Sequence, residues 1–387
     1  MYIAYNPQQR FLLKNILQRF NPVNCIQLLK RTWAIMPDND LRYFSKGKWA
    51  IEKLASAFIR SIGKENGRIF IPEYFCEISL TPLRIAEHNL HFYRINSELE
   101  PDIDHLNSLV KKYGAPDILL YVQYFGFPLK IKDTIRWCKE NEALLIEDAA
   151  HSMLPVPGIG DNGCPTVYTP WKFLGLTEGG VLVLPDEMAS IFEQSAPNTD
   201  NKSDIFKTVA LRTGASAVDF IGMRGFPIHK FKKPYVKEPD ESEQWQDPKT
   251  PEYYNRSLKI LSNFDKKEIE KIKNNRERNY RRIDDAILNS SINKYRLFRK
   301  LPKLFAPYVY PLRVPENISM KAMIELNNKG IRSFPWSDLS PEVKNSSLYP
   351  LSNALRREVI TLPIHQDMTI KHVDWMAKEV VKQLEKF

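Results

Sequence analysis

Residues 144–152 of this 387-residue chain read LLIEDAAHS. An apolar run typical of a buried strand ends in Glu147 and Asp148, and two small residues and His151 follow. In an α/β protein, ligands bind beside the carboxyl ends of the strands. An aspartate at a strand end is by itself more often a turn former or a helix cap than a catalytic group. The stretch therefore has to be interpreted together with the segments around it.

The chain on both sides of this stretch alternates short apolar runs with amphipathic patterns. We expect strands at 68–71, 90–94, 117–122, 143–147, 166–169 and 180–184, with helices at 48–62, 76–87, 102–113 and 131–141. Such alternation is typical of βαβ units on a mostly parallel sheet. The sequence therefore predicts an α/β fold class with a ligand site at one edge of the large sheet.

The second half of the chain predicts a smaller domain. Residues 186–262 have the composition of a loop or lid, and a long charged helix follows at about 265–289. A strand at 308–314 and helices at 320–329 and 374–386 come after it. We expect an N-terminal helical extension over 1–35, a large domain over 36–264 and a small C-terminal α/β domain over 265–387.

The composition excludes several protein classes. Lysine and arginine number 56 against 46 acidic residues, so a net charge of +10 favours anionic ligands. The basic stretch 266–282 alternates with acids at helical spacing, which indicates a solvated helix face and no nucleic-acid partner. Four scattered cysteines without a C-x-x-C motif predict neither a disulfide framework nor a metal site. We interpret Cys138 as an exposed cysteine that is dispensable for activity.

The sequence predicts a cytoplasmic protein. It contains no apolar run of roughly 18 to 20 residues and no signal peptide at its start. An amphipathic pattern over 8–20 predicts a helix that either packs on the main body or touches a membrane surface. Of these two interpretations we favour packing.

A lysine follows in residues 168–180, which read YTPWKFLGLTEGG. Lys172 stands among apolar and small neighbours, where loss of solvation disfavours the ammonium form and leaves a nucleophilic amine. A lysine beside tryptophan and phenylalanine is, taken alone, usually a surface residue with a buried stem. Its meaning depends on its place downstream of Asp148.

The two segments together resemble the DegT/DnrJ/EryC1/StrS family of pyridoxal-phosphate-dependent sugar aminotransferases. That family has a strand ending in E-D-x-A-(Q/H) and, downstream, a lysine followed six residues later by E-G-G. Other stretches agree with its motifs: Ile69–Pro72, Tyr124–Pro128 as Y-x-G-x-P, and Leu362–His365 as L-P-x-H. The resemblance runs from about residue 40 to the end, and it implies the fold-type I architecture of a large seven-stranded domain and a small domain.

The resemblance implies a role for each motif residue. Lys172 would hold pyridoxal 5′-phosphate as a Schiff base and then move the proton between substrate and cofactor. Asp148 would pair with the pyridine nitrogen, and His151 would lie near the 3′-oxygen. The cofactor phosphate would bind where a helix begins, at Gly47 and Lys48, because helix N-termini bind anions. Thr169 is a second candidate for the phosphate.

This chain departs from the family pattern at several places. Lys48 stands where a threonine is usual, and Val167 where a phosphate-binding serine is usual. The position that normally places an aromatic ring over the cofactor falls at Cys76, which leaves Tyr74 or Phe75 as replacements. A G-Y-N-Y-R segment that reaches the neighbouring subunit is absent in clear form. The chain therefore resembles a divergent branch.

The function implied is transfer of an amino group from an amino acid, by analogy glutamate, to a keto group on a nucleotide-linked sugar. The product would feed polysaccharide, lipopolysaccharide or amino-sugar biosynthesis, and the enzyme would be a homodimer. The alternative is a silent or differently reacting relative that binds a sugar nucleotide or a partner protein. Dehydratases of this fold replace the lysine with histidine, so Lys172 argues against dehydration.

Overall fold

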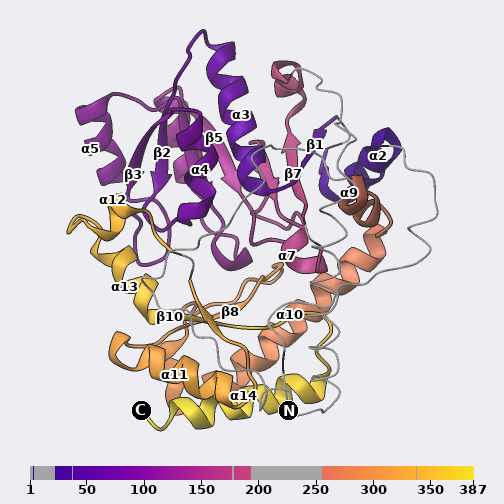
Figure 1. Cartoon of the computed structure of the whole chain (residues 1–387), viewed down its shortest axis with the longest axis vertical. Coiled ribbons are helices and arrows are strands. Elements are labelled where there is room, and N and C mark those ends of the chain that lie inside the picture. Colours follow the sequence, from indigo (N-terminus) through magenta and orange to yellow (C-terminus); the bar gives the residue numbers. More distant parts are fainter. Residues whose placement is uncertain (1–2, 4–21, 37, 177, 193–254, 337) are drawn as a thin grey trace.

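Two sheets organise the chain. The computed structural model describes residues 3, 22–36, 38–176, 178–192, 255–336 and 338–387, and the statements below concern these residues. One sheet has seven strands and the other has three. Figure 1 shows the large sheet with its helices in the upper part of the molecule and the small sheet with the C-terminus in the lower part.

The seven-stranded sheet is mostly parallel, with the strand order β1-β7-β6-β5-β4-β2-β3. Neighbouring strands from β3 to β6 pair in parallel, whereas β7 runs antiparallel to both β6 and β1. Every residue of β4 and of β7 is buried, as expected for a sheet covered on both faces. The predicted fold class is confirmed. The strands are β1 (Asp40–Phe44), β2 (Arg68–Pro72), β3 (Asn89–Tyr93), β4 (Ile118–Val122), β5 (Leu144–Asp148), β6 (Thr166–Tyr168) and β7 (Gly180–Leu184).

Helices connect and cover these strands. α3 packs on β1, β6 and β7, while α5 packs on β3 and α6 on β5. Local signals set their ends: the Asp102 carboxylate accepts a hydrogen bond from the His105 N–H at the start of α5, and Gly114 ends that helix at a φ of 86°. The elements are α2 (Pro22–Trp33), α3 (Gly47–Ser61), α4 (Glu77–Ile85), α5 (Ile103–Tyr113), η1 (Tyr124–Gly126), α6 (Lys132–Glu140), α7 (Trp171–Leu174), η2 (Asp186–Ile191) and α9 (Asn255–Ser262).

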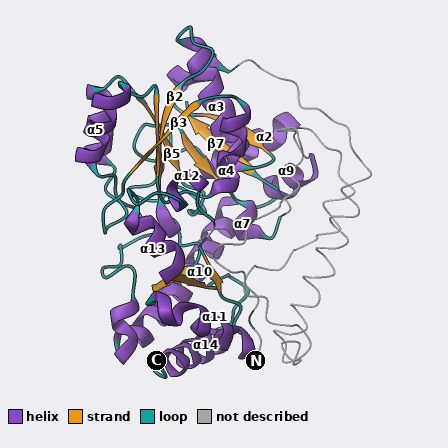
Figure 2. Ribbon diagram, turned by 60° about the vertical axis from the view of Figure 1, so that its left-hand side comes forward, coloured by secondary structure: helices purple, strands orange, loops and turns teal. Residues whose placement is uncertain are grey.

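The small domain packs helices on a three-stranded antiparallel sheet of order β8-β10-β9. α10 begins at a capping box in which Asp265 and Glu268 each accept the other's backbone N–H. In Figure 1 this helix runs from α9, beside the large domain, down to α14, against which it packs. Figure 2 shows the same small domain below the large sheet. Its elements are α10 (Lys266–Leu288), η4 (Ser291–Tyr295), β8 (Tyr310–Arg313), α11 (Glu316–Asn328), β9 (Phe334–Pro335), α12 (Pro341–Lys344), α13 (Pro350–Glu358), β10 (Val359–Leu362) and α14 (Ile370–Leu384).

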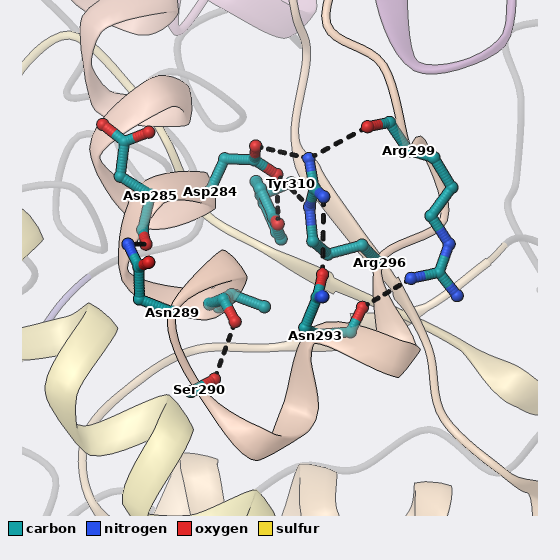
Figure 3. Close-up of polar contacts among 9 residues, drawn as sticks. Asp284, Asp285, Asn289, Ser290, Asn293, Arg296, Arg299 and Tyr310 are labelled. Carbon is teal, nitrogen blue, oxygen red and sulfur yellow. Dashed lines mark hydrogen bonds and ion pairs between the residues drawn. The ribbon is translucent and has the colours of Figure 1, made fainter.

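A buried ion pair fixes α10 against the segment that follows it (Figure 3). Arg296 donates hydrogen bonds of 2.8 and 2.7 Å to the Asp284 carboxylate, and the Tyr310 hydroxyl donates another of 2.8 Å. The two charged side chains are only 6% and 4% exposed. Because a buried charge is costly without its partner, these bonds hold α10, the chain after η4 and β8 in one arrangement.

Several elements differ from the sequence prediction. The strand expected over 308–314 is Tyr310–Arg313, and the helix expected over 320–329 already begins at Glu316, directly after Pro315. The prediction missed β1, because Arg42 interrupts its apolar pattern, and it also missed β10. It also missed α2. The helix predicted over 8–20, and most of 186–262, lie outside the described residues.

Cys138 is buried, so the expectation that it is exposed was wrong, while its dispensability for activity stays a prediction. The residue lies on α6 and is 2% exposed. Burial raises the pKa of its thiol to about 12. Its amphipathic helix turns the face that carries Cys138 toward the core, so this cysteine is a packing residue. No helix among the described residues is long and apolar enough to cross a bilayer.

Candidate active site

The last two residues of β5 face opposite sides of the sheet, because strand side chains alternate. Glu147 is fully buried and accepts hydrogen bonds from Gln123 Nε2, the Gly160 N–H and Thr166 Oγ1 at 2.6, 2.9 and 3.1 Å. These bonds join three segments at the carboxyl end of the sheet. Glu147 is therefore engaged in holding the fold, while Asp148 interacts electrostatically with Lys172.

Asp148 and Lys172 interact electrostatically. Burial raises the pKa of Asp148, and the lysine charge and a 2.8 Å hydrogen bond from the Ala150 N–H partly offset that rise. Burial likewise lowers the pKa of Lys172, and Asp148 partly opposes the fall. Lys172 lies on the one-turn helix α7, between β6 and β7. The pair provides a carboxylate beside an amine that loses its proton more readily than an ordinary lysine.

His151 is held in one neutral form. Its ring stacks on Tyr308 at a centroid distance of 5.2 Å, and its Nδ1 accepts the Phe125 N–H at 3.3 Å. Burial, followed by the Lys172 charge, lowers the pKa of His151 well below its usual value. Because Nδ1 acts as an acceptor, the proton of the neutral ring lies on Nε2. His151 can therefore donate a hydrogen bond to an oxygen of a ligand.

The start of α3 forms a second polar corner of the site. A Cβ added to Gly47 would meet the Thr169 methyl group at 2.5 Å, so only glycine fits this close approach. Thr169 Oγ1 donates to the Ala150 carbonyl at 2.6 Å, which joins the β6–α7 turn to the segment after Asp148. The Gly179 N–H donates to the Ser45 carbonyl at 2.8 Å. The start of α3 thus lies against the loops that carry Asp148 and Lys172.

The structure brings most of the predicted site residues together. The Lys172 charge acts on both Asp148 and His151, and Gly47 lies against Thr169. Lys48 lies nearby, but its amine donates to the Ile78 carbonyl at 3.3 Å at the start of α4.

The replacements considered for the ring that covers the cofactor lie differently. Tyr74 is fully buried and stacks on Trp336 at 4.8 Å, so its ring belongs to the packed region between the domains. Phe75 is 5% exposed. Cys76 is partly exposed, and its thiolate form would raise the pKa of both Lys172 and Lys48. The position that falls at Cys76 therefore does lie at the site.

Sequence reasoning missed the aromatic residues that frame His151. Tyr308 begins the segment predicted as a strand, and Lys172 Nζ lies 5.6 Å from the centre of its ring. Trp336 meets His151 edge-on at 5.1 Å. Both belong to the small domain, far from β5 in the sequence, and no local motif marks them. Among the described residues, no group of three or more His, Cys, Asp or Glu could hold a metal ion.

The similarity of this chain to known proteins was found by comparing structures and not by comparing whole sequences. No family model and no curated sequence matches it. The aminotransferase TlmJ from Streptoalloteichus hindustanus is 14% identical, with both chains fully covered and a TM-score of 0.65. PseC from Helicobacter pylori, an aminotransferase involved in pseudoaminic acid biosynthesis, is also 14% identical over the full length of both chains, with a TM-score of 0.63.

A third structure carries the family description itself. A DegT DnrJ EryC1 StrS aminotransferase from Brucella abortus is 12% identical, covers 93% of this chain and 94% of its own, and has a TM-score of 0.57. At such low sequence identity, these structural similarities establish the fold alone. This chain therefore has the fold of the sugar aminotransferases, as its motifs predicted.

Proposed function

We propose that this chain is a pyridoxal-phosphate-dependent aminotransferase. The observation that carries the proposal is the Asp148–Lys172 pair at the carboxyl edge of the sheet, with the neutral His151 beside it. A cofactor with a pyridine nitrogen, a ring oxygen and an aldehyde matches a carboxylate, an N–H donor and an amine. The fold shared with known aminotransferases supports the same assignment.

The residues present fit this cofactor. Ser45 Oγ is fully buried and has no hydrogen-bond partner among the described residues. It precedes the start of α3, where no side chain caps the helix and no acidic residue lies in the first turn. Helix N-termini favour anions. A phosphate here would take up the Ser45 hydroxyl and the first amides of α3, next to Gly47.

Each residue would have a defined task with the cofactor bound. Pyridoxal phosphate supplies an electron sink for the carbanion formed at the substrate Cα. Asp148 would keep the pyridine nitrogen protonated, since a nearby carboxylate favours the charged form. Lys172 would bind the aldehyde carbon and then, once free, move the proton at Cα through Nζ. His151 would donate from Nε2 to the ring oxygen.

We assign the substrates by charge and by analogy. The amino donor in this proposal is glutamate, and the acceptor is a keto sugar linked to a nucleotide, for polysaccharide, lipopolysaccharide or amino-sugar biosynthesis. The net charge of +10 suits an anionic diphosphate. The chain would act as a homodimer. PseC, described as an enzyme of pseudoaminic acid biosynthesis, supports the choice of a sugar acceptor.

The absorbance spectrum of the purified protein with added pyridoxal phosphate, before and after glutamate, tests this proposal. We expect a visible band that depends on Lys172 and shifts when glutamate is added. Lys172→Ala should lose both the band and turnover, and Asp148→Asn should bind cofactor poorly and lose nearly all activity. Lys130→Ala is the matched control, because the Lys130 side chain is 81% exposed. Wild-type turnover by Lys172→Ala would refute the proposal.

One feature supports the alternative of a silent relative. Val167, where the family usually has a phosphate-binding serine, is fully buried and lies against Gly47. A protein that binds a sugar nucleotide without transferring an amino group would show no lysine-dependent band. Binding of a sugar nucleotide measured by calorimetry, in the absence of that band, would favour this second function.

A further inference from the structure

The turn that carries Lys172 is too short to set its own geometry. α7 has four residues, and its first backbone hydrogen bonds reach back only to Thr169 and Pro170. A single helical turn is unstable in water, because nucleation fixes several residues for few bonds. The place of the lysine therefore depends on contacts from other parts of the chain.

Gln366 supplies one of these contacts. Its Nε2 donates a 2.8 Å hydrogen bond to the carbonyl of Phe173, the residue after Lys172. The last carbonyls of a helix lack partners within the helix, so this bond satisfies one of them. Gln366 follows β10 in the small domain. The bond therefore joins the small domain to α7, the turn that carries Lys172.

Arg276 of α10 holds Gln366 in place. Its Nη1 donates to Gln366 Oε1 at 2.9 Å, and its guanidinium carbon lies 4.9 Å from the centre of the Phe173 ring. Its Nη2 and Nε donate to the Tyr308 and Pro307 carbonyls at 2.6 and 3.2 Å. The residue is only 2% exposed. A planar guanidinium can serve these acceptors at once, whereas a lysine amine cannot reach them all.

The same arginine thus controls two sides of the active site. Through Gln366 it holds the lysine turn, and through Tyr308 it holds the ring that lies 5.6 Å from Lys172 Nζ and stacks on His151. We propose that Arg276 and Gln366 are positioning residues that set where the Lys172 amine lies relative to Asp148 and His151. This inference rests on the proposed function and adds to it two residues outside the family motifs quoted above.

Two variants with one matched control test the inference. Arg276→Lys keeps the charge but loses the planar donors, and Gln366→Met keeps the length of the side chain but loses both hydrogen bonds. Arg282→Lys is the control, because it makes the first substitution on the same helix at a side chain that is 42% exposed and pairs with Asp374. Asp148 and Cys76, which also affect the pKa of Lys172, stay unchanged in all three.

The first readout does not require turnover. In full-length protein stripped of cofactor, the labelling of Lys172 by an amine reagent is followed against pH by peptide mass spectrometry. Burial holds the pKa of Lys172 below its ordinary value. In both variants we expect the labelling midpoint to move up toward that of ordinary lysines, since a looser turn admits water. We also expect kcat to fall about tenfold or more with a smaller change in KM.

The outcomes separate this inference from the proposed function. If both variants lower the melting temperature but label like wild type, the residues are only structural and the inference is wrong. If labelling moves as expected while the wild-type protein shows no transamination, the proposed function fails and the positioning role stands. Should Arg276→Lys fail to fold, Gln366→Met decides alone, because it leaves the arginine in place.

Discussion

Two adjacent carboxylates in this chain have opposite surroundings. Glu147 accepts three hydrogen bonds that join segments of the fold, and Asp148 accepts one backbone bond and acts on Lys172. Their difference follows from strand geometry, since neighbouring side chains point to opposite faces. Burial raises the pKa of both. Lys172 is the cation beside Asp148. Its presence equips Asp148, and not Glu147, for chemistry.

His151 gives a residue-scale prediction. Because its Nδ1 accepts the Phe125 N–H and its pKa is lowered well below the usual value, Nε2 should carry the only ring proton from pH 6 to 9. His151→Gln keeps an N–H donor and should retain most activity. His151→Leu should lose roughly tenfold to a hundredfold in kcat. Steady-state kinetics measures both.

The ring can also be observed directly. Nitrogen NMR of the histidine ring should show the Nε2–H tautomer with no titration step for His151 in that pH range. A protonation step near the ordinary histidine pKa, or equal losses in the two variants, would contradict the assigned hydrogen bond.

At the scale of elements, the site lies where the start of α3 meets the β6–α7 turn. A Cβ on Gly47 would come within 3.4 Å of a Val167 methyl group, so the valine fills space beside the proposed phosphate position. Val167→Ser would place a hydroxyl there. We expect this change to lower the Kd for pyridoxal phosphate about fivefold to tenfold. Such a change corresponds to one added hydrogen bond of about 1 kcal/mol.

The control for this change is Val167→Ala, which removes the same bulk without adding a donor. Fluorescence titration with pyridoxal phosphate should separate the two variants. Equal affinities for serine and alanine would mean that the phosphate lies away from β6.

At the scale of the whole molecule, the buried pair of Asp284 and Arg296 should dominate the stability of the small domain. Asp284→Asn leaves a buried arginine without its counter-charge and should lower the free energy of unfolding by about 3 to 5 kcal/mol. Asp374→Asn breaks an ion pair whose side chains are each 42% exposed, and should cost less than about 1 kcal/mol. Urea denaturation compares the two, and similar losses would contradict this account.

The contact between the two domains should depend on pH. Glu73 follows β2, accepts the Ile95 N–H at 3.0 Å and lies near Ser352 of α13. Burial raises the pKa of Glu73 to about 7. The pKa of a glutamate in the unfolded chain is about 4.3. Between about pH 4.3 and pH 7, therefore, the folded state binds more protons than the unfolded state does. The free energy of unfolding should therefore fall as pH rises through this window, by about 4 kcal/mol at most.

Glu73→Gln should remove this part of the pH dependence and leave the protein more stable than wild type at pH 8. Urea denaturation at pH 5, 6, 7 and 8 measures the difference. Parallel curves for the two proteins would show that Glu73 titrates in the ordinary range.

The alternation of strands and helices could be predicted because it depends on near neighbours. The strand expected at 117–122 is Ile118–Val122, and the helix expected at 102–113 is Ile103–Tyr113. Each is marked by a pattern of apolar residues or by a helix cap within its own segment. The strand β1 could not be predicted in the same way, because Arg42 interrupts its apolar pattern and its place in the sheet depends on pairing with β7, more than a hundred positions away. The domain boundaries stay a prediction.

The residues of the candidate site also differ in whether local sequence predicts them. Asp148, His151 and Lys172 lie in short motifs whose residue types already indicate an amine, a carboxylate and an imidazole at one sheet edge, and the fold confirms where that edge lies. Tyr308, Arg276 and Gln366 have no such motif. They reach the site only because the small domain packs against α7, and side-chain contacts between distant segments depend on packing, which local patterns do not encode.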